Sequence, residues 1–148
     1  MKRLTLMAVA LLFFATGVSF AQSQPIPMQG CKLAGSCAFG GSQISTVTVT
    51  WGAAATSRFL MIFDTTAGAA PSNGASPPLC AANPQANPCL LFCNAAIDST
   101  TAPGFIGEDW TTHPVQGRHG IVAAMSTGAD CSTFTQDGNN DSFFAQVK

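Results

Sequence analysis

Apolar residues recur at every second position in two stretches of the chain, within residues 43–51 and 142–148. A period of two places successive side chains on opposite faces of a β-strand. The pattern therefore predicts two half-buried strands, each with one row of apolar side chains directed inward. The inward residues of the two strands are Val47, Val49, Trp51, Phe143, Ala145 and Val147.

A third stretch is apolar on both of its faces. Residues 58–64 read Arg-Phe-Leu-Met-Ile-Phe-Asp, an apolar run with a charge at each end. A strand that is buried on both faces has this continuous pattern, so we predict a central strand here. If only one face meets the core, Leu60 and Ile62 need another cover. That cover is either the loop over residues 65–88 or a neighbouring subunit.

Shorter apolar stretches complete the set of predicted strands. They cover residues 90–92, 105–106 and 120–127. The region between residues 65 and 88 holds five prolines, which exclude regular helix and predict a long surface loop. No 3.6-residue period persists after residue 21. We therefore expect an all-β fold, an antiparallel β-sandwich or jelly roll, forming a single domain over residues 43–148.

The first 21 residues have the pattern of a secretory signal peptide. Lys2 and Arg3 precede an apolar run over residues 4–18, and Ser19-Phe20-Ala21 forms a small-x-small cleavage site. An uncleaved anchor is the alternative. Residues 22–42 are then expected to form an extended arm and a small cysteine loop. The prediction is an exported protein, periplasmic or extracellular, with no membrane span after cleavage.

All six cysteines follow this leader, which predicts disulfide bonds in an oxidising compartment. They are Cys31, Cys37, Cys80, Cys89, Cys93 and Cys131. Proximity along the chain favours a bond between Cys31 and Cys37. The other four would form two bonds that tie the proline-rich loop to the sheet. Zinc requires paired Cys-x2–4-Cys motifs, and Cys89 with Cys93 is the one pair that approaches this spacing, so we expect no metal and no cofactor.

The charge balance argues against a nucleic-acid partner. Without residues 1–21, four Lys and Arg side chains stand against seven Asp and Glu side chains, a net charge of −3. Four scattered cations do not form the basic stripe that a phosphate backbone requires.

Four segments resemble the strands of small β-sandwich structural proteins of tailed-phage virions, of the head-decoration or head-fibre type. The segments are residues 47–64, 78–80, 120–127 and 143–147. Proteins of this type pair a strand that ends near Asp, after a turn of small residues, with a later strand that starts at Gly and ends in Ser. The resemblance implies a β-sandwich without catalytic activity, whose partner is itself or another structural protein, as in a homo-oligomer.

The segment Asp137-Gly138-Asn139-Asn140-Asp141 begins with the ligand spacing of a calcium loop. The rest of the motif is absent, because Ser142 replaces the required glycine and Lys148 replaces the bidentate glutamate. A polar hairpin turn explains the same residues, and we favour the turn.

Two histidines, His113 and His119, lie near Glu108 and Asp109 in the sequence and could form an acid–base cluster. Nothing in the sequence places them beside a nucleophile, and the chain has no Gly-x-Ser-x-Gly motif. We expect solvated loop residues and no enzymatic activity.

Trp110 follows two acidic residues in a predicted loop and is a candidate for surface contact. The sequence as a whole predicts a non-enzymatic, exported structural or surface-assembly subunit with Leu60, Ile62 and Trp110 as its candidate interface. The alternative is a secreted module that binds a glycan or a cell surface through Trp110 and the loops around Asn73 and Asn83.

Overall fold

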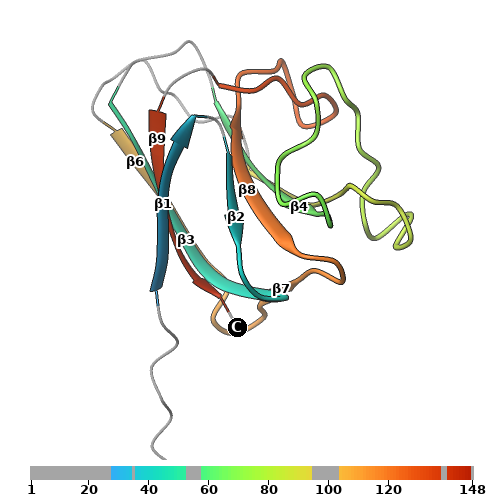
Figure 1. Ribbon diagram of the computed structural model, residues 1–148, viewed down its shortest axis with the longest axis horizontal. Helices are drawn as coiled ribbons and strands as arrows, with labels where there is room; N and C mark the ends of the chain where they lie inside the picture. The colour runs from blue at the N-terminus through green and yellow to red at the C-terminus, as the bar shows by residue number, and fades with distance from the viewer. Residues whose placement is uncertain (1–27, 35, 53–57, 95–103, 138–139, 148) are drawn as a thin grey trace, which may run out of the picture.

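A computed structural model describes most of the chain after the predicted signal peptide (Figure 1). The described residues are 28–34, 36–52, 58–94, 104–137 and 140–147. Residues 1–21, the predicted leader, lie outside them. In the described part every regular element is a strand, and no helix there has the length and hydropathy of a membrane span.

The strands form two antiparallel sheets that face each other (Figure 1). The first sheet has the order β1 (Met28–Ala34), β9 (Asn140–Val147), β3 (Gln43–Trp51) and β6 (Gly104–Asp109), and β7 (Val115–Gln116) also pairs with β3. The second sheet has the order β2 (Ser36–Phe39), β8 (Ile121–Ser126), β4 (Phe59–Asp64) and β5 (Cys89–Cys93). The predicted all-β, sandwich-like class is confirmed, whereas the narrower jelly-roll topology stays a prediction.

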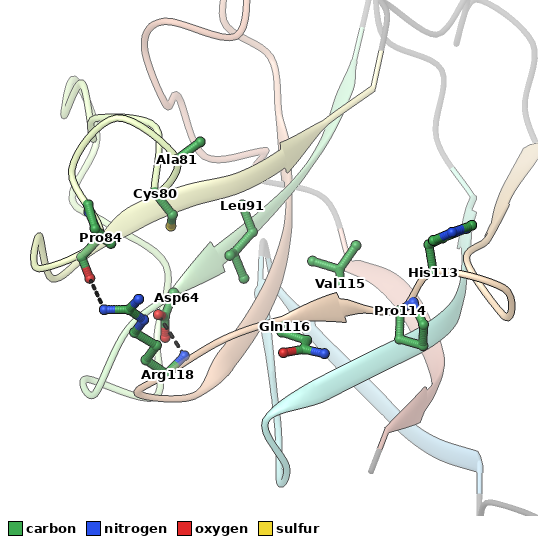
Figure 2. A pocket seen from close by; sticks show the side chains of 10 residues that line it. All are labelled: Asp64, Cys80, Ala81, Pro84, Leu91, His113, Pro114, Val115, Gln116 and Arg118. Atoms are coloured by element: carbon green, nitrogen blue, oxygen red, sulfur yellow. Dashed lines mark hydrogen bonds between the residues drawn. The ribbon is translucent and has the colours of Figure 1, made fainter.

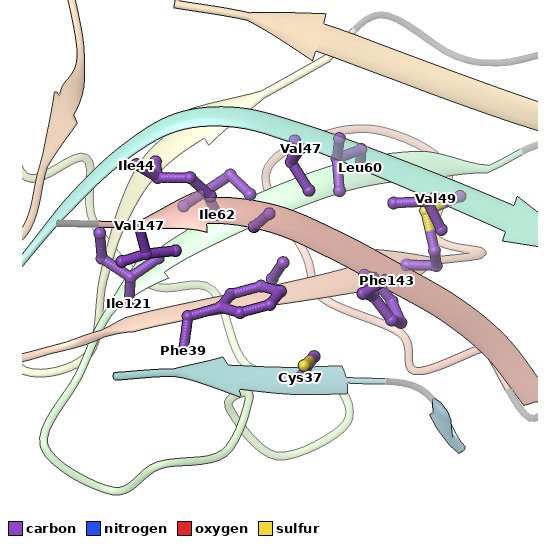
Figure 3. Packing of buried hydrophobic residues seen from close by; sticks show 13 residues of the cluster. Cys37, Phe39, Ile44, Val47, Val49, Leu60, Ile62, Ile121, Phe143 and Val147 are labelled. Carbon is purple, nitrogen blue, oxygen red and sulfur yellow. The ribbon is translucent and has the colours of Figure 1, made fainter. Parts of the chain in front are cut away.

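The core lies between the sheets, and the alternating strands supply it as predicted. In the pairing of β3 with β9, Val49 stands opposite Phe143 and Val47 opposite Ala145, and all four side chains are buried. Figure 3 shows Val47, Val49 and Phe143 in one buried cluster with Leu60 and Ile62 of β4 and Ile121 of β8. Trp51 is also buried, so its predicted core position is confirmed.

The structure corrects the interface assignment of Leu60 and Ile62. Both are fully buried and lie in the core between the sheets, so neither can contact a partner. The outward residues of β4 are Phe59, Met61 and Phe63. A continuous apolar run has no polar face, and the sequence alone therefore could not distinguish the inner row from the outer one.

Loops cover the outer face of β4. Phe134 packs its ring edge against Phe63, with 5.5 Å between the ring centroids. The backbone of Phe134 joins the covering loops, because its carbonyl accepts from Gly74 N–H and its own N–H donates to Ala75 O, each at 2.8 Å. Of the two predicted covers for this strand, the loop over residues 65–88 is therefore present, together with the loop that contains Phe134.

Part of the segment predicted as an arm and a cysteine loop belongs to the sandwich. Strand β1 pairs with β9 over seven residues, and β2 pairs with β8 over four. The prediction of an extended arm and a small cysteine loop over residues 22–42 did not include these two strands, because glycine and cysteine hide strand periodicity here. Residues 22–27 lie outside the described part.

Disulfide bonds are confirmed. They join Cys80 to Cys89 and Cys93 to Cys131. Cys37 is disulfide-bonded as well, and no described cysteine is free. The side chain of Cys31, its predicted partner, lies outside the described residues. Closed disulfides accord with export to an oxidising compartment.

Candidate functional site

A cleft of about 430 Å³ opens at one edge of the sandwich, between β5 of one sheet and β7 of the other (Figure 2). Its lining residues come from four segments that are distant in sequence. They are Asp64, Cys80, Ala81, Pro84, Leu91, His113, Pro114, Val115, Gln116 and Arg118. This volume lies in the range of sites that bind small molecules.

Asp64 builds one wall of the cleft by holding a turn. Its carboxylate accepts from the backbone N–H groups of Arg118, His119 and Gly120, at distances of 2.7 to 3.1 Å. The ring Nδ1 of His119 lies 3.3 Å from Asp64 Oδ2. Burial alone would raise the pKa of Asp64, but the three N–H donors and His119 outweigh burial and lower it. Asp64 is therefore an anchor for residues 118–120 and has no free oxygen for a ligand.

The polar groups that remain in the cleft are mainly hydrogen-bond donors. Arg118 is exposed, and its guanidinium makes one long hydrogen bond to Pro84 O at 3.5 Å, which leaves most of its five N–H groups available. The amide of Gln116 and the ring of His113 lie further along the same cleft (Figure 2). Leu91 and Val115 form the apolar floor between them.

The opposite wall is held by the short disulfide loop. The Cys80–Cys89 bond joins two residues nine positions apart, and the loop that it closes contains Ala81 and Pro84. Backbone hydrogen bonds fix the base of this loop, since Cys80 N–H donates to Leu90 O and Leu90 N–H donates to Pro78 O. The cleft therefore has two walls that are largely formed before any ligand binds.

The four residues of the proposed acid–base cluster do not converge. Glu108 accepts from the side-chain amide of Asn94, and Asp109 accepts from Thr111 N–H at 2.9 Å. His113 contacts Thr112, whereas His119 contacts Asp64. Each of the four residues therefore contacts a different partner, and none of these described contacts joins two of the four to each other.

Trp110 is half-buried and packs against Phe92 of β5, with ring centroids 4.8 Å apart. Trp110 follows β6 of the first sheet and contacts β5 of the second sheet. This contact leaves less of its ring exposed for binding a partner than in a solvent-exposed loop tryptophan.

The sulfur atoms of Cys80 and Cys89 and a carboxylate oxygen of Asp64 lie within 4.8 Å of one another, as in a metal cluster. The two sulfurs are bonded to each other, so neither is a thiolate that could bind zinc. Cys89 and Cys93, the pair with zinc-like spacing, belong to different disulfides.

The sequence did not indicate the turn held by Asp64 or the cleft behind it. A buried acid at the end of an apolar strand was the available signal, since such an acid needs several donors. Glycines on both sides of Arg118-His119 are typical of a turn that could supply them. The contact between this turn and the end of β4 joins residues more than 50 positions apart, and local sequence patterns do not predict contacts of this kind.

Comparison with protein-family models, with curated proteins and with solved structures finds no match for this chain. The function is therefore inferred from the geometry of the chain itself.

Proposed function

We propose that the protein is an exported, non-enzymatic binding module whose ligand occupies the cleft between β5 and β7. The observation that carries this proposal is a cleft with preformed walls whose lining combines the polar side chains of Arg118, Gln116 and His113 with the apolar side chains of Leu91 and Val115. An apolar pocket with a few converging polar groups is the usual form of a ligand site. The disulfides support a periplasmic or extracellular location.

The donors favour a ligand that is rich in acceptors and carries a negative charge. Asp64 adds little repulsion, because its carboxylate already accepts three backbone N–H groups. Arg118 can bind a carboxylate with two parallel hydrogen bonds. Leu91 and Val115 would contact the apolar C–H face of a sugar ring. We therefore infer an acidic glycan that contains uronic-acid units.

The test is isothermal titration of the oxidised protein, residues 22–148, with uronic-acid oligosaccharides and with neutral oligosaccharides of equal length. We expect binding of the acidic series and a 10- to 100-fold loss of affinity in Arg118→Ala, since hydrogen bonds to charged groups contribute about 1.5–3 kcal/mol. Lys32→Ala is the matched control, because it removes one positive charge from β1, a strand that supplies no lining residue of the cleft. Equal binding of the neutral series, unchanged affinity in Arg118→Ala, or no binding of either series would contradict the proposal.

A structural or surface-assembly subunit, as in the phage-virion resemblance, is the second candidate. Its support is the outer face of the first sheet, where Phe105 is 76% and Phe144 is 42% exposed. Across β3, which lies between them, Phe144 stands opposite Thr48 and Phe105 opposite Thr50. Two exposed aromatic rings on one face of a sheet suit packing against another subunit.

Light scattering over a concentration series tests this second candidate. An assembly subunit should form a defined oligomer that dissociates in the double variant Phe105→Ser and Phe144→Ser. Leu79→Ser is the control, because Leu79 is an apolar residue elsewhere on the surface whose exposure, 57%, lies between those of Phe144 and Phe105. A strict monomer at every concentration would exclude self-assembly and leave the binding module.

A further inference from the structure

A cluster of three charged side chains is buried at the end of the sandwich where β4 and β9 begin. Arg58 Nε lies 2.8 Å from Asp137 Oδ2, and Arg58 Nη1 donates to Asp141 Oδ1 at 3.2 Å. The side chains of Arg58 and Asp141 are 0% exposed and that of Asp137 is 3% exposed. The guanidinium also lies over the ring of Trp51, 5.6 Å from its centroid. Asp137 and Asp141 are the two ends of the predicted polar turn and both are buried beside Arg58, whereas residues 138 and 139 lie outside the described part.

The cluster has one positive and two negative charges. Burying a charge is costly unless an opposite charge and hydrogen bonds compensate it. Arg58 contacts both carboxylates, but its single positive charge can neutralise the charge of one of them. Asp141 Oδ2 is buried without a hydrogen-bond partner. One additional positive charge would therefore complete the cluster.

The strands around Asp141 supply no such charge from their described side chains. On β1 the residue paired with Asp141 is Leu33. The next residue of β9, Ser142, is paired with Thr50 on β3 and with Lys32 on β1, whose side chain lies outside the described part. The preceding loop brings Asp137, and the start of β4 brings Arg58. The acidic groups therefore outnumber the basic groups on the sides of Asp141 that the structure describes.

We propose that the Arg58–Asp137–Asp141 cluster takes up one proton, on Asp141, when the surroundings become mildly acidic. The protonated carboxyl gains an O–H donor and reduces the charge of the cluster to zero. Burial is the main cause that raises the pKa of Asp141 to about 6, and the Asp137 carboxylate adds to this rise against the attraction of Arg58. The protein is thus built to become more stable as the pH falls below neutral.

The sign follows from linkage between proton binding and folding. In the unfolded chain Asp141 has its ordinary pKa of 3.8, and in the folded chain the pKa is about 6. Between these values the folded state binds more protons, so stability decreases as the pH rises. Because the pKa of Asp141 rises from 3.8 to about 6 on folding, the equilibrium constant for unfolding should be about tenfold smaller at pH 5 than at pH 7.

The experiment compares urea unfolding of the oxidised protein at pH 5 and pH 7. We expect the tenfold change in the wild type, and its loss in Asp141→Asn. Loss is also expected in Asp137→Asn, because one carboxylate then balances one guanidinium. Asp130→Asn is the control: Asp130 is an exposed acid that hydrogen-bonds Ser132, and its removal should keep the tenfold change.

Carboxyl NMR of the wild type tests the same proposal without a substitution. We expect the Asp141 carboxyl signal to titrate with its midpoint near pH 6, and a midpoint near pH 4 would overturn the proposal. A pH effect that persists unchanged in Asp141→Asn would also overturn it. So would a rise in stability at pH 7 on addition of calcium that Asp141→Asn abolishes, because a metal ion would then supply the missing charge.

Discussion

At the scale of single residues, Trp51 links the core to the buried cluster of charges. One side of its ring meets Gly104, the paired residue on β6, and the guanidinium of Arg58 lies over the ring. The alternation of β3 predicted that Trp51 is buried. It did not predict the cation above the ring, since Arg58 was expected at a charged strand end. Arg58 is fully buried because two acids from a loop far along the chain reach it.

Gly104→Ala tests how closely the Trp51 ring is packed. A Cβ atom at residue 104 would lie 2.4 Å from two atoms of the ring, so the ring must move. Overpacking of this kind costs about 1–3 kcal/mol. We expect thermal unfolding of Gly104→Ala to show that loss, while Gly52→Ala, where a Cβ meets nothing within 4 Å, stays close to the wild type. Equal melting temperatures for both variants would mean that the ring relocates freely.

At the scale of elements, local patterns predicted the longer strands and missed what depends on pairing. Alternation predicted β3 and β9, and continuous apolar runs predicted β4 and β8. Strands β1, β2 and β7 have no such pattern and exist because a neighbour supplies their hydrogen bonds. The cleft depends on these same pairings. His113 was singled out from the sequence, but Asp64 and Arg118 meet across 54 residues, which no local pattern encodes.

The two disulfides should contribute unequally, since they close loops of different length. The Cys93–Cys131 bond spans 38 residues and the Cys80–Cys89 bond spans nine. On loop-closure entropy the first contributes about 4 kcal/mol and the second about 2.5 kcal/mol. We expect urea unfolding of the paired Cys→Ser variants to show the larger loss for Cys93 and Cys131. The reverse order would indicate that the short loop has a packing role beyond closure.

At the scale of the whole molecule, the pH dependence of stability should reflect two buried carboxylates with opposite behaviour. Asp64 is stabilised as an anion, and its contribution is present above the unfolded pKa of 3.8 and is lost as the pH falls further. Asp141 is destabilised as an anion, and stability decreases as the pH rises through about 6. Between pH 3.8 and about 6, Asp64 is ionised and Asp141 is protonated in the folded protein, and each of these forms stabilises the fold. We therefore expect the highest melting temperature at about pH 4 to 5.

Melting curves from pH 3 to pH 8 would separate the two limbs of this profile. Asp141→Asn should flatten the decline toward neutral pH and leave the acid limb in place. Asp64→Asn should lower the melting temperature at every pH, because an amide nitrogen cannot accept the N–H groups of residues 118–120, and it should flatten the acid limb. A maximum at pH 7 or above in the wild type would contradict the assignment of Asp141. A maximum near pH 5 that survives Asp141→Asn would place the titrating group elsewhere in the molecule.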